Sequence, residues 1–230
     1  ELGKTWFFEA ECAWNWYMEI GTDNNNTLYV EINSAFCNND GWCKTLLPDE
    51  EYTSSECIYG CTNGGFEEAA AALIKCKRMR KERKFDTIPV VFNDYMNCIW
   101  TKTLSKTLKP IVDAAAKAGC EVFCMDAGWY RDMTDEEKLG DWQPENARFD
   151  GGFDEMIKYI SSKGMQPGVW LEIDSITENS DFFADNKDCL LKKCGHFAGG
   201  GGRYLADFTQ SEVRSRFMKI FDMLYSKGVR

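Results

Sequence analysis

Residues 140–142 read Gly-Asp-Trp, residues 149–152 read Phe-Asp-Gly-Gly, and residues 163–172 read Lys-Gly-Met-Gln-Pro-Gly-Val-Trp-Leu-Glu. The glycines punctuate this pattern, so residues 152–163 are predicted to form a helix and residues 168–173 a strand. A loop, a helix and an apolar strand in this order are typical of a β/α unit. The stretch therefore predicts part of an α/β fold.

The same alternation covers the chain after residue 85. Apolar runs at residues 88–92 and 121–125 predict strands, and the first of them, Ile-Pro-Val-Val-Phe, is expected to be buried. Helices are predicted at residues 104–118 and 211–227, each followed by glycine. Strands that alternate with helices form a parallel sheet, which is either open or closed into a barrel.

The first 64 residues follow a different pattern. Short aromatic or β-branched runs, such as those at residues 6–8 and 28–32, alternate with polar turns. This pattern predicts antiparallel strands from the edge of a sandwich. Residues 65–84 are rich in alanine and become basic towards their end, as expected of a connecting helix. We therefore expect three parts, at residues 1–64, 65–84 and 85–230.

Composition limits the partners. The chain has 27 Lys and Arg against 37 Asp and Glu, a net charge of −10, which argues against nucleic acid or an anionic membrane surface. No apolar run approaches the roughly 20 residues of a membrane span, and the N-terminus does not have the pattern of a signal peptide. Eleven cysteines, an odd number, favour reduced thiols and a cytoplasmic protein over a disulfide framework.

Cys189, Cys194 and His196 have the spacing that most resembles a metal site. They lack the paired Cys-x-x-Cys knuckles of a zinc site, so a loop with two free thiols is the alternative. His196 is the only histidine, which makes carboxylate chemistry a better expectation than a Ser-His-Asp triad.

Acidic side chains follow each predicted strand of the second half of the chain. In parallel β/α folds, functional residues lie at the carboxyl ends of strands, and here these are Asp94, Asp126, Glu172 and Asp174. Because buried, unpaired acids are costly, this succession predicts a polar pocket. A helix cap or a pairing with arginine is the alternative for any one of them. Glu172 and Asp174 share one face if their strand extends that far.

Trp142 follows the second of these strands by a loop. We expect it to face a ligand, because a flat aromatic face can stack on a sugar ring. Trp129, Trp142 and Trp170 as core aromatics are the alternative.

The chain resembles the α-galactosidases of glycoside hydrolase family 36 at these residues. The resemblance covers nearly the whole chain in order, and the N-terminal part is similar to the end of that family's β-sandwich domain. The similar segments are Trp14-Asn15-Trp16 and residues 47–50, 89–93, 121–130, 140–142, 163–172 and 203–207.

The resemblance implies a partial (β/α)8 TIM barrel of about three units, preceded by the end of a β-sandwich. It also implies a retaining α-galactosidase with an Asp nucleophile, a carboxylic acid/base and no cofactor. By position, Asp126 should bind sugar hydroxyls, Trp142 should line the sugar subsite and Arg203 should donate hydrogen bonds near the nucleophile. Tyr95 falls near the position at which many members of the family carry a tryptophan. Ala127 stands where many members have a second aspartate, so a related enzyme with an altered sugar specificity is an alternative.

The expected site divides into sugar-binding residues in this chain and catalytic residues outside it. Both catalytic carboxylates are expected beyond Arg230, because the chain ends before a fourth strand, so the chain alone should be inactive. The rival hypothesis is a non-catalytic barrel remnant or carbohydrate-binding module. An oligosaccharide or galactoside is the expected partner. A homo-oligomer is also possible for the full-length protein, because the β-sandwich domains of the family often take part in subunit contacts. The predicted substrate-binding residues are Asp94, Tyr95, Asp126, Trp129, Trp142, Glu172, Asp174 and Arg203.

Overall fold

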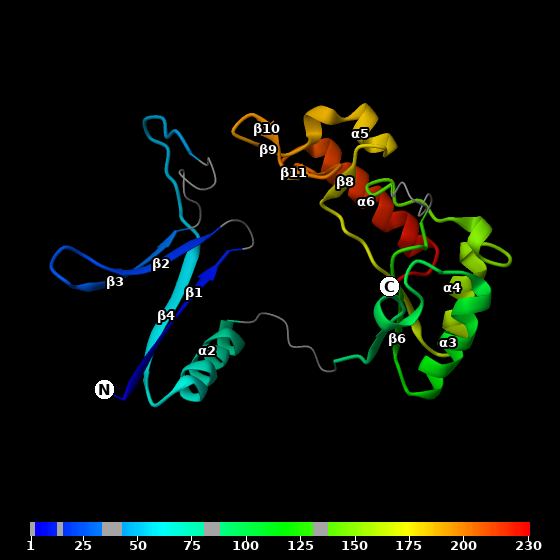
Figure 1. The fold of residues 1–230 in the computed structure, drawn as a ribbon, viewed down its shortest axis with the longest axis horizontal. Helices are drawn as coiled ribbons and strands as arrows, with labels where there is room; N and C mark the ends of the chain where they lie inside the picture. Colours follow the sequence, from blue (N-terminus) through cyan, green and yellow to red (C-terminus); the bar gives the residue numbers. More distant parts are fainter. Residues whose placement is uncertain (1–2, 13–15, 34–42, 81–87, 131–137) are drawn as a thin grey trace. The chain divides into compact units, whose positions relative to one another are not determined.

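The computed structural model describes residues 3–12, 16–33, 43–80, 88–130 and 138–230. The chain divides into two compact units, residues 1–86 and 87–230 (Figure 1). Among the described residues, none of the helices has the length and apolarity that crossing a membrane would require.

The first unit contains two antiparallel strand pairs, as the sequence pattern predicts. Strand β1 (Lys4–Glu11) pairs with β4 (Glu56–Asn63), and β2 (Tyr17–Thr22) pairs with β3 (Leu28–Asn33). The β2–β3 turn is closed by the Asp23 carboxylate, which accepts hydrogen bonds from two backbone N–H groups of the turn at 2.8 Å. Trp14 and Asn15, and the polar turn expected at residues 38–41, lie outside the described residues.

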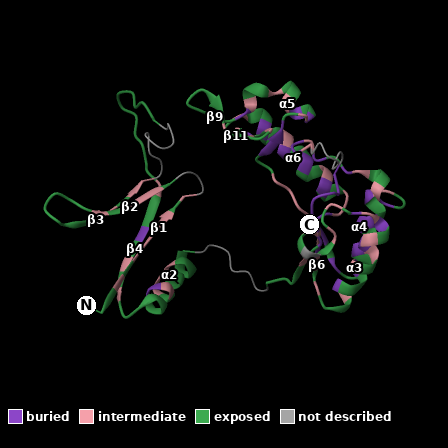
Figure 2. Cartoon of the chain, in the orientation of Figure 1, coloured by how far each residue is buried: buried purple, intermediate pink, exposed green. Residues whose placement is uncertain are grey.

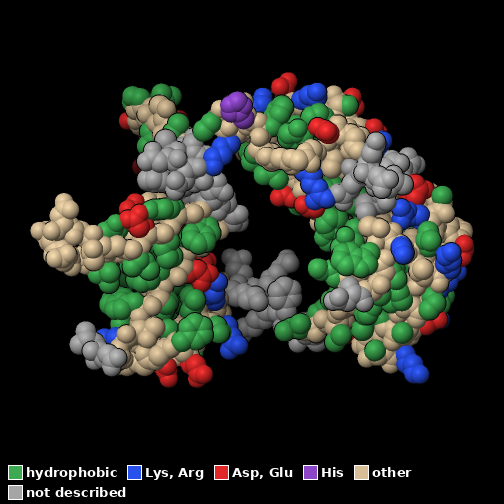
Figure 3. All heavy atoms as spheres, viewed as in Figure 1, with side chains coloured by type: hydrophobic (Ala, Val, Ile, Leu, Met, Phe, Trp, Pro, Cys, Tyr) green, Lys and Arg blue, Asp and Glu red, His purple; other side chains and the backbone are tan. Residues whose placement is uncertain are grey.

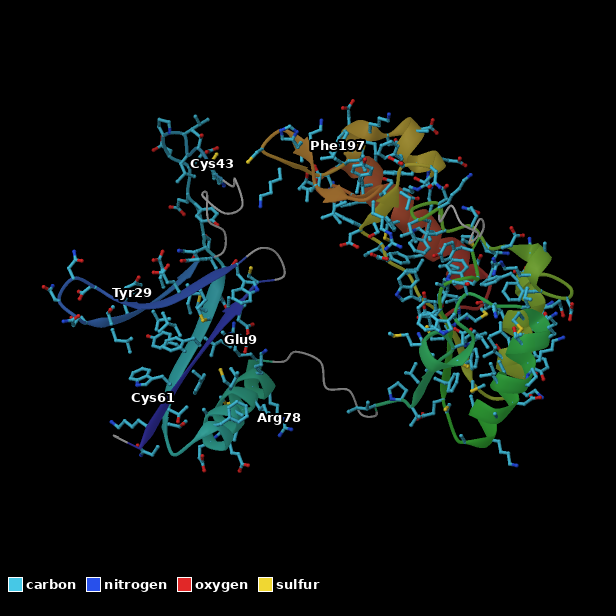
Figure 4. The ribbon with its side chains drawn as sticks, viewed as in Figure 1. Glu9, Tyr29, Cys43, Cys61, Arg78 and Phe197 are labelled. Atoms are coloured by element: carbon cyan, nitrogen blue, oxygen red, sulfur yellow. The ribbon has the colours of Figure 1, made fainter. Side chains whose placement is uncertain are left out.

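Helix α2 (Phe66–Arg80) packs against the β1–β4 pair. Ala69 of the helix and Ile58 of β4 are buried. Lys77 of α2 forms an ion pair with Glu9, which lies on β1 and is labelled in Figure 4. The opposite face of this pair is open: Trp6 and Tyr59 are 61% and 72% exposed.

The second unit is built on a three-stranded parallel sheet in the order β5-β6-β7. The strands are β5 (Val91–Asn93), β6 (Val122–Met125) and β7 (Gln166–Val169), with Val122 opposite both Val91 and Gln166. Because the three strands are parallel and adjacent, their carboxyl ends meet along one edge of the sheet. The parallel sheet agrees with the prediction from the sequence.

The helices of the second unit also follow the predicted pattern. They are α3 (Ser105–Lys117), α4 (Phe153–Ser162) and α6 (Ser211–Ser226). Helix α3 ends before Gly119, whose φ of +87° favours glycine. Each of the three helices turns a buried apolar face to the core of this unit (Figure 2), and together they supply 11 of the 24 buried residues of its core cluster.

Two expectations about the strands are wrong. Residues 88–92 are not buried: Ile88 is 90% exposed and Val91 55% exposed. Among the described strands, β5 pairs with β6 alone and lies at the edge of the sheet. Strand β7 starts at Gln166 and ends at Val169, so Glu172 and Asp174 lie in the following loop. Glu172 and Asp174 therefore do not share one face of a strand.

An excursion between β7 and α6 was not predicted. It contains β8 (Ser175–Thr177), α5 (Asp181–Asp185), the short helix η3 (Lys187–Cys189) and four two- or three-residue strands. Those strands are β9 (Lys192–Lys193), β10 (His196–Phe197), β11 (Gly199–Gly200) and β12 (Arg203–Leu205). The two hairpins, β9–β10 and β11–β12, turn at Cys194-Gly195 and Gly201-Gly202, with positive φ at all four residues. Such pairs of positive φ angles are what tight two-residue hairpins require.

Candidate active site

Asp94 and Asp126 lie at the carboxyl ends of the neighbouring strands β5 and β6. Asp94 is fully buried and Asp126 is 9% exposed. One carboxylate oxygen of Asp94, Oδ1, accepts a hydrogen bond from the backbone N–H of Asp126 at 2.8 Å. The other, Oδ2, is buried without a hydrogen-bond partner among the described residues. The parallel register thus brings two predicted site residues, 32 positions apart, into direct contact.

Hydrogen-bond donors hold the carboxylate of Asp126. Its Oδ2 accepts from the side-chain amide of Asn93 at 2.6 Å, and its Oδ1 accepts from the backbone N–H of Ala127 at 2.6 Å. Asn93 is itself oriented, because its Oδ1 accepts from the backbone N–H of Tyr95 at 2.9 Å. The short segment 93–95 therefore orients the Asp126 side chain through Asn93 and its backbone through Asp94.

The surroundings of Asp94 favour its neutral form. Burial, followed by the nearby Asp126 charge, raises the pKa of Asp94 to about 6. Burial, with the charges of Asp126 and Asp94, raises the pKa of the Cys124 thiol to about 11. None of the ion pairs formed among the described residues involves either aspartate. Two adjacent acids without a cation cannot both be ionised cheaply in a desolvated place.

The loop after β7 holds a second polar group. Glu172 accepts a hydrogen bond from the Ser175 hydroxyl at 2.6 Å and lies 3.6 Å from the guanidinium of Arg203 on β12. Both side chains are partly exposed. Asp174 is exposed, and its backbone oxygen accepts from the N–H of Ala206 at 2.8 Å. The excursion thus brings Arg203 to Glu172, while the Asp174 carboxylate points to solvent.

Trp142 lies in the core, which differs from the expectation that it faces a ligand. It is fully buried, and its ring lies 4.9 Å from Tyr130, 6.3 Å from Trp129 and 5.9 Å from Trp170. Trp129 is also fully buried and donates from Nε1 to the backbone oxygen of Trp170 at 2.9 Å. In this structure Trp129 and Trp142 are core aromatics, which corresponds to the alternative interpretation.

Tyr95 begins the short helix η1 (Tyr95–Ile99), which follows directly on Asp94. Its ring is half-buried and makes an edge contact with Trp100, with a centroid distance of 5.1 Å. The i→i+5 hydrogen bond from the Trp100 N–H to the Tyr95 oxygen is characteristic of a π-helix, which often occurs at functional sites.

A family model described as Melibiase matches residues 52–229, which is most of the chain. The chain belongs to the melibiase family.

Two curated relatives of this melibiase-family chain are α-galactosidases. The chain is 30% identical to alpha-galactosidase 1 of Pediococcus pentosaceus, over 96% of this chain and 30% of that protein. It is 26% identical to alpha-galactosidase Mel36A of Lactobacillus acidophilus, over 99% of this chain and 31% of that protein. The chain therefore spans about a third of the length of these relatives. The resemblance to the α-galactosidase family is confirmed.

Solved structures of similar fold include the GH36 α-galactosidase AgaA of Geobacillus stearothermophilus. Its complex with 1-deoxygalactonojirimycin matches with a TM-score of 0.86 at 20% identity, over 99% of this chain and 32% of that one. The galactosidase domain of AgaSK matches with a TM-score of 0.85 at 22% identity, over 98% and 32% of the two chains. AgaA variants have also been solved in complex with raffinose and stachyose.

Two residues that make several hydrogen bonds around the strand ends and loops were not singled out from the sequence. Asn93 holds Asp126, and its only signal was its place at the end of a predicted strand. Asp141, of the Gly-Asp-Trp motif, accepts from the N–H groups of Asp181 and Phe182 at the start of α5 and from Arg216 of α6. No local pattern indicates these contacts, because the partners of Asp141 lie 40 to 75 positions away.

The proposed metal ligands do not come together. Among the described residues, no group of three or more His, Cys, Asp or Glu side chains could hold a metal ion. Cys194 is at a hairpin turn, and His196 is exposed on β10, where it forms the purple patch of Figure 3. Free thiols are found at Cys43, Cys57, Cys61, Cys76, Cys98, Cys120, Cys124, Cys189 and Cys194.

Proposed function

We propose that this chain is the sugar-binding part of a retaining α-galactosidase that removes terminal α-galactose from oligosaccharides. The observation that carries the proposal is the contact between Asp94 and Asp126 at the carboxyl ends of adjacent parallel strands. In β/α barrels, substrates bind at this edge of the sheet. The strands β5, β6 and β7 would then be the first three of a (β/α)8 barrel, and the first unit would be the end of a β-sandwich domain.

The assigned roles follow from the contacts. The carboxylate of Asp126 is oriented by Asn93 and Ala127, and its remaining acceptor capacity can take up hydroxyl donors of a sugar. Arg203, kept near Glu172, supplies guanidinium donors at the rim of the same edge. Trp129 and Trp142 are assigned a packing role in the core of the same unit. No cofactor is needed for this chemistry.

The catalytic steps belong to residues beyond Arg230. A retaining glycosidase uses one carboxylate as nucleophile and a second carboxyl group as acid/base, about 5 Å apart across the scissile bond. Glu172 is engaged with Ser175 and Arg203, and Asp174 points to solvent, so we do not assign them as this pair.

The alternative is a carbohydrate-binding protein without catalysis, which would use the same Asp94–Asp126 site. One experiment distinguishes the two functions. We would compare the 230-residue chain with a longer protein that continues the reading frame past Arg230, testing hydrolysis of p-nitrophenyl α-galactoside and binding of methyl α-galactoside. We expect only the longer protein to hydrolyse, and both to bind.

Asp126→Asn is the test variant, and Asp154→Asn is its control. Removing the Asp126 charge should weaken binding by about tenfold or more, the equivalent of one charged hydrogen bond. Asp154 forms a surface ion pair with Lys227 at 2.7 Å, and its replacement should leave binding unchanged. Hydrolysis by the 230-residue chain would refute the assignment of roles. Binding without hydrolysis by the longer protein would favour the non-catalytic alternative.

A further inference from the structure

One carboxylate oxygen of Asp94 is buried without a hydrogen bond from any described residue. Its side chain is fully buried, and Oδ2 has no hydrogen-bond partner among the described residues. An ionised carboxylate in such a place would be costly, because burial removes its hydration and, among the described residues, no hydrogen bond to Oδ2 replaces it. A protonated carboxyl group needs much less stabilisation, so the burial of Asp94 favours its neutral form.

The groups that face Asp94 add to this preference. From the end of β6 come the Asp126 carboxylate and the Cys124 thiol, and from η1 comes the Cys98 thiol, all acidic or neutral. The ionised form of Asp94 would repel the Asp126 carboxylate, which carries the proposed sugar contacts. The direct link between the two residues is the hydrogen bond from the Asp126 N–H to Asp94 Oδ1 at 2.8 Å.

We propose that Asp94 is a positioning residue for the proposed sugar site, and that it holds Asp126 in the binding geometry only while it is protonated. Neutral Asp94 accepts the Asp126 N–H through one oxygen and keeps its proton on the other. When the proton leaves for solvent, two adjacent carboxylates face each other and Asp126 moves away from the geometry that binds the sugar. This inference rests on the proposed function and deepens it.

The consequence is a sugar affinity that depends on pH. The pKa of Asp94 is raised to about 6, first by burial and then by the Asp126 charge. The binding-competent fraction of the protein should therefore fall as pH rises above 6. Because apparent affinity scales with the competent fraction, we expect it to weaken by roughly tenfold or more between pH 5 and pH 7.5.

The experiment measures binding of methyl α-galactoside to the 230-residue chain from pH 5 to pH 7.5. This probe is uncharged, so any pH dependence comes from the protein. Asp94→Asn keeps an oxygen that accepts the Asp126 N–H and carries N–H donors where the neutral acid has its proton. We expect this variant to bind at all pH values with the affinity that the wild-type chain has at pH 5. Asp94→Ala should bind weakly at every pH.

The control is Asp154→Asn, whose pH profile should match that of the wild-type chain. Parallel wild-type and Asp94→Asn profiles would overturn the inference and leave the proposed function intact, provided that Asp126→Asn still weakens binding. If Asp126→Asn binds like the wild-type chain, or if the wild-type chain binds at no pH, the sugar site itself is wrong and the inference is overturned with it.

Discussion

The guanidinium of Arg216 donates a hydrogen bond to the carboxylate of Asp141 at 2.9 Å, and this contact ties helix α6 to the loop after β6. The same carboxylate accepts from the N–H of Asp181 at 2.9 Å and of Phe182 at 3.1 Å, while Arg216 also bonds the Gly140 oxygen. A carboxylate at the start of α5 satisfies N–H groups that the helix leaves unpaired. One side chain thus joins the loop after β6 to both α5 and α6.

Asp141→Ala should destabilise the protein, because it leaves the Arg216 charge and two helix N–H groups without their acceptor. We expect a loss of about 2–4 kcal/mol in the free energy of unfolding, measured with urea. Lys158→Ala is the control, because it removes only an exposed ion pair with Glu155. Equal losses in the two variants would mean that the Asp141 contacts contribute little.

Asp94→Asn should change how stability depends on pH. The folded-state pKa of Asp94, about 6, lies above its ordinary value of 3.8, so the folded protein binds this proton more tightly. The stability contribution is therefore complete below pH 4 and is lost as pH rises through 6. The difference between wild type and variant should change by on the order of 3 kcal/mol at most from pH 4 to pH 7.5. A constant difference would show that Asp94 is ionised in the fold.

Trp142→Ala should be far more destabilising than Trp100→Ala. Both tryptophans have a positive φ, +49° and +53°, and alanine keeps the Cβ that makes this conformation unfavourable, so neither variant relieves backbone strain. Trp142 is fully buried, whereas Trp100 is 54% exposed. We expect a loss of about 3–5 kcal/mol for the buried residue and clearly less for the exposed one. Thermal unfolding of the two variants provides the comparison.

This burial also determines how the role of Trp142 in sugar binding can be tested. Its indole N–H has no hydrogen-bond partner among the described residues. Trp142→Phe removes that N–H while keeping an aromatic ring in the core. If Trp142 acts only through packing, methyl α-galactoside should bind this variant as it binds the wild-type chain. A loss of binding by a stable Trp142→Phe protein would instead support the prediction from the sequence that Trp142 contacts the sugar.

Gly128→Ala should cost more stability than Gly119→Ala. Both glycines have positive φ, +116° and +87°, so both variants carry backbone strain of about 1–2 kcal/mol. At Gly128 the new Cβ would also lie 2.5 Å from the Thr103 hydroxyl and 3.0 Å from the Thr101 oxygen, whereas at Gly119 no atom lies within 4 Å. We expect an additional loss of roughly 1–3 kcal/mol at Gly128 in a urea titration.

Local patterns in the sequence were enough for the elements near the site. The parallel strands β5, β6 and β7 and the helices α3, α4 and α6 follow from apolar periodicity and from glycines at helix ends, which are properties of neighbouring residues. The acidic residues at the strand ends followed from the same reasoning. The excursion with its two short hairpins did not, because strands of two or three residues carry too little periodicity to be recognised.

The sequence by itself determined the family, the alternation of strands and helices, and the acidic composition of the strand ends. Only the tertiary structure decided which of those residues meet. Asp94 contacts Asp126 because parallel register places residues 32 positions apart side by side, and Glu172 meets Arg203 because the excursion folds back. Trp142 lies in the core and Val91 at the surface, although both are apolar. Burial depends on which elements pack together, and that is a property of the assembled sheet and helices rather than of any local run of residues.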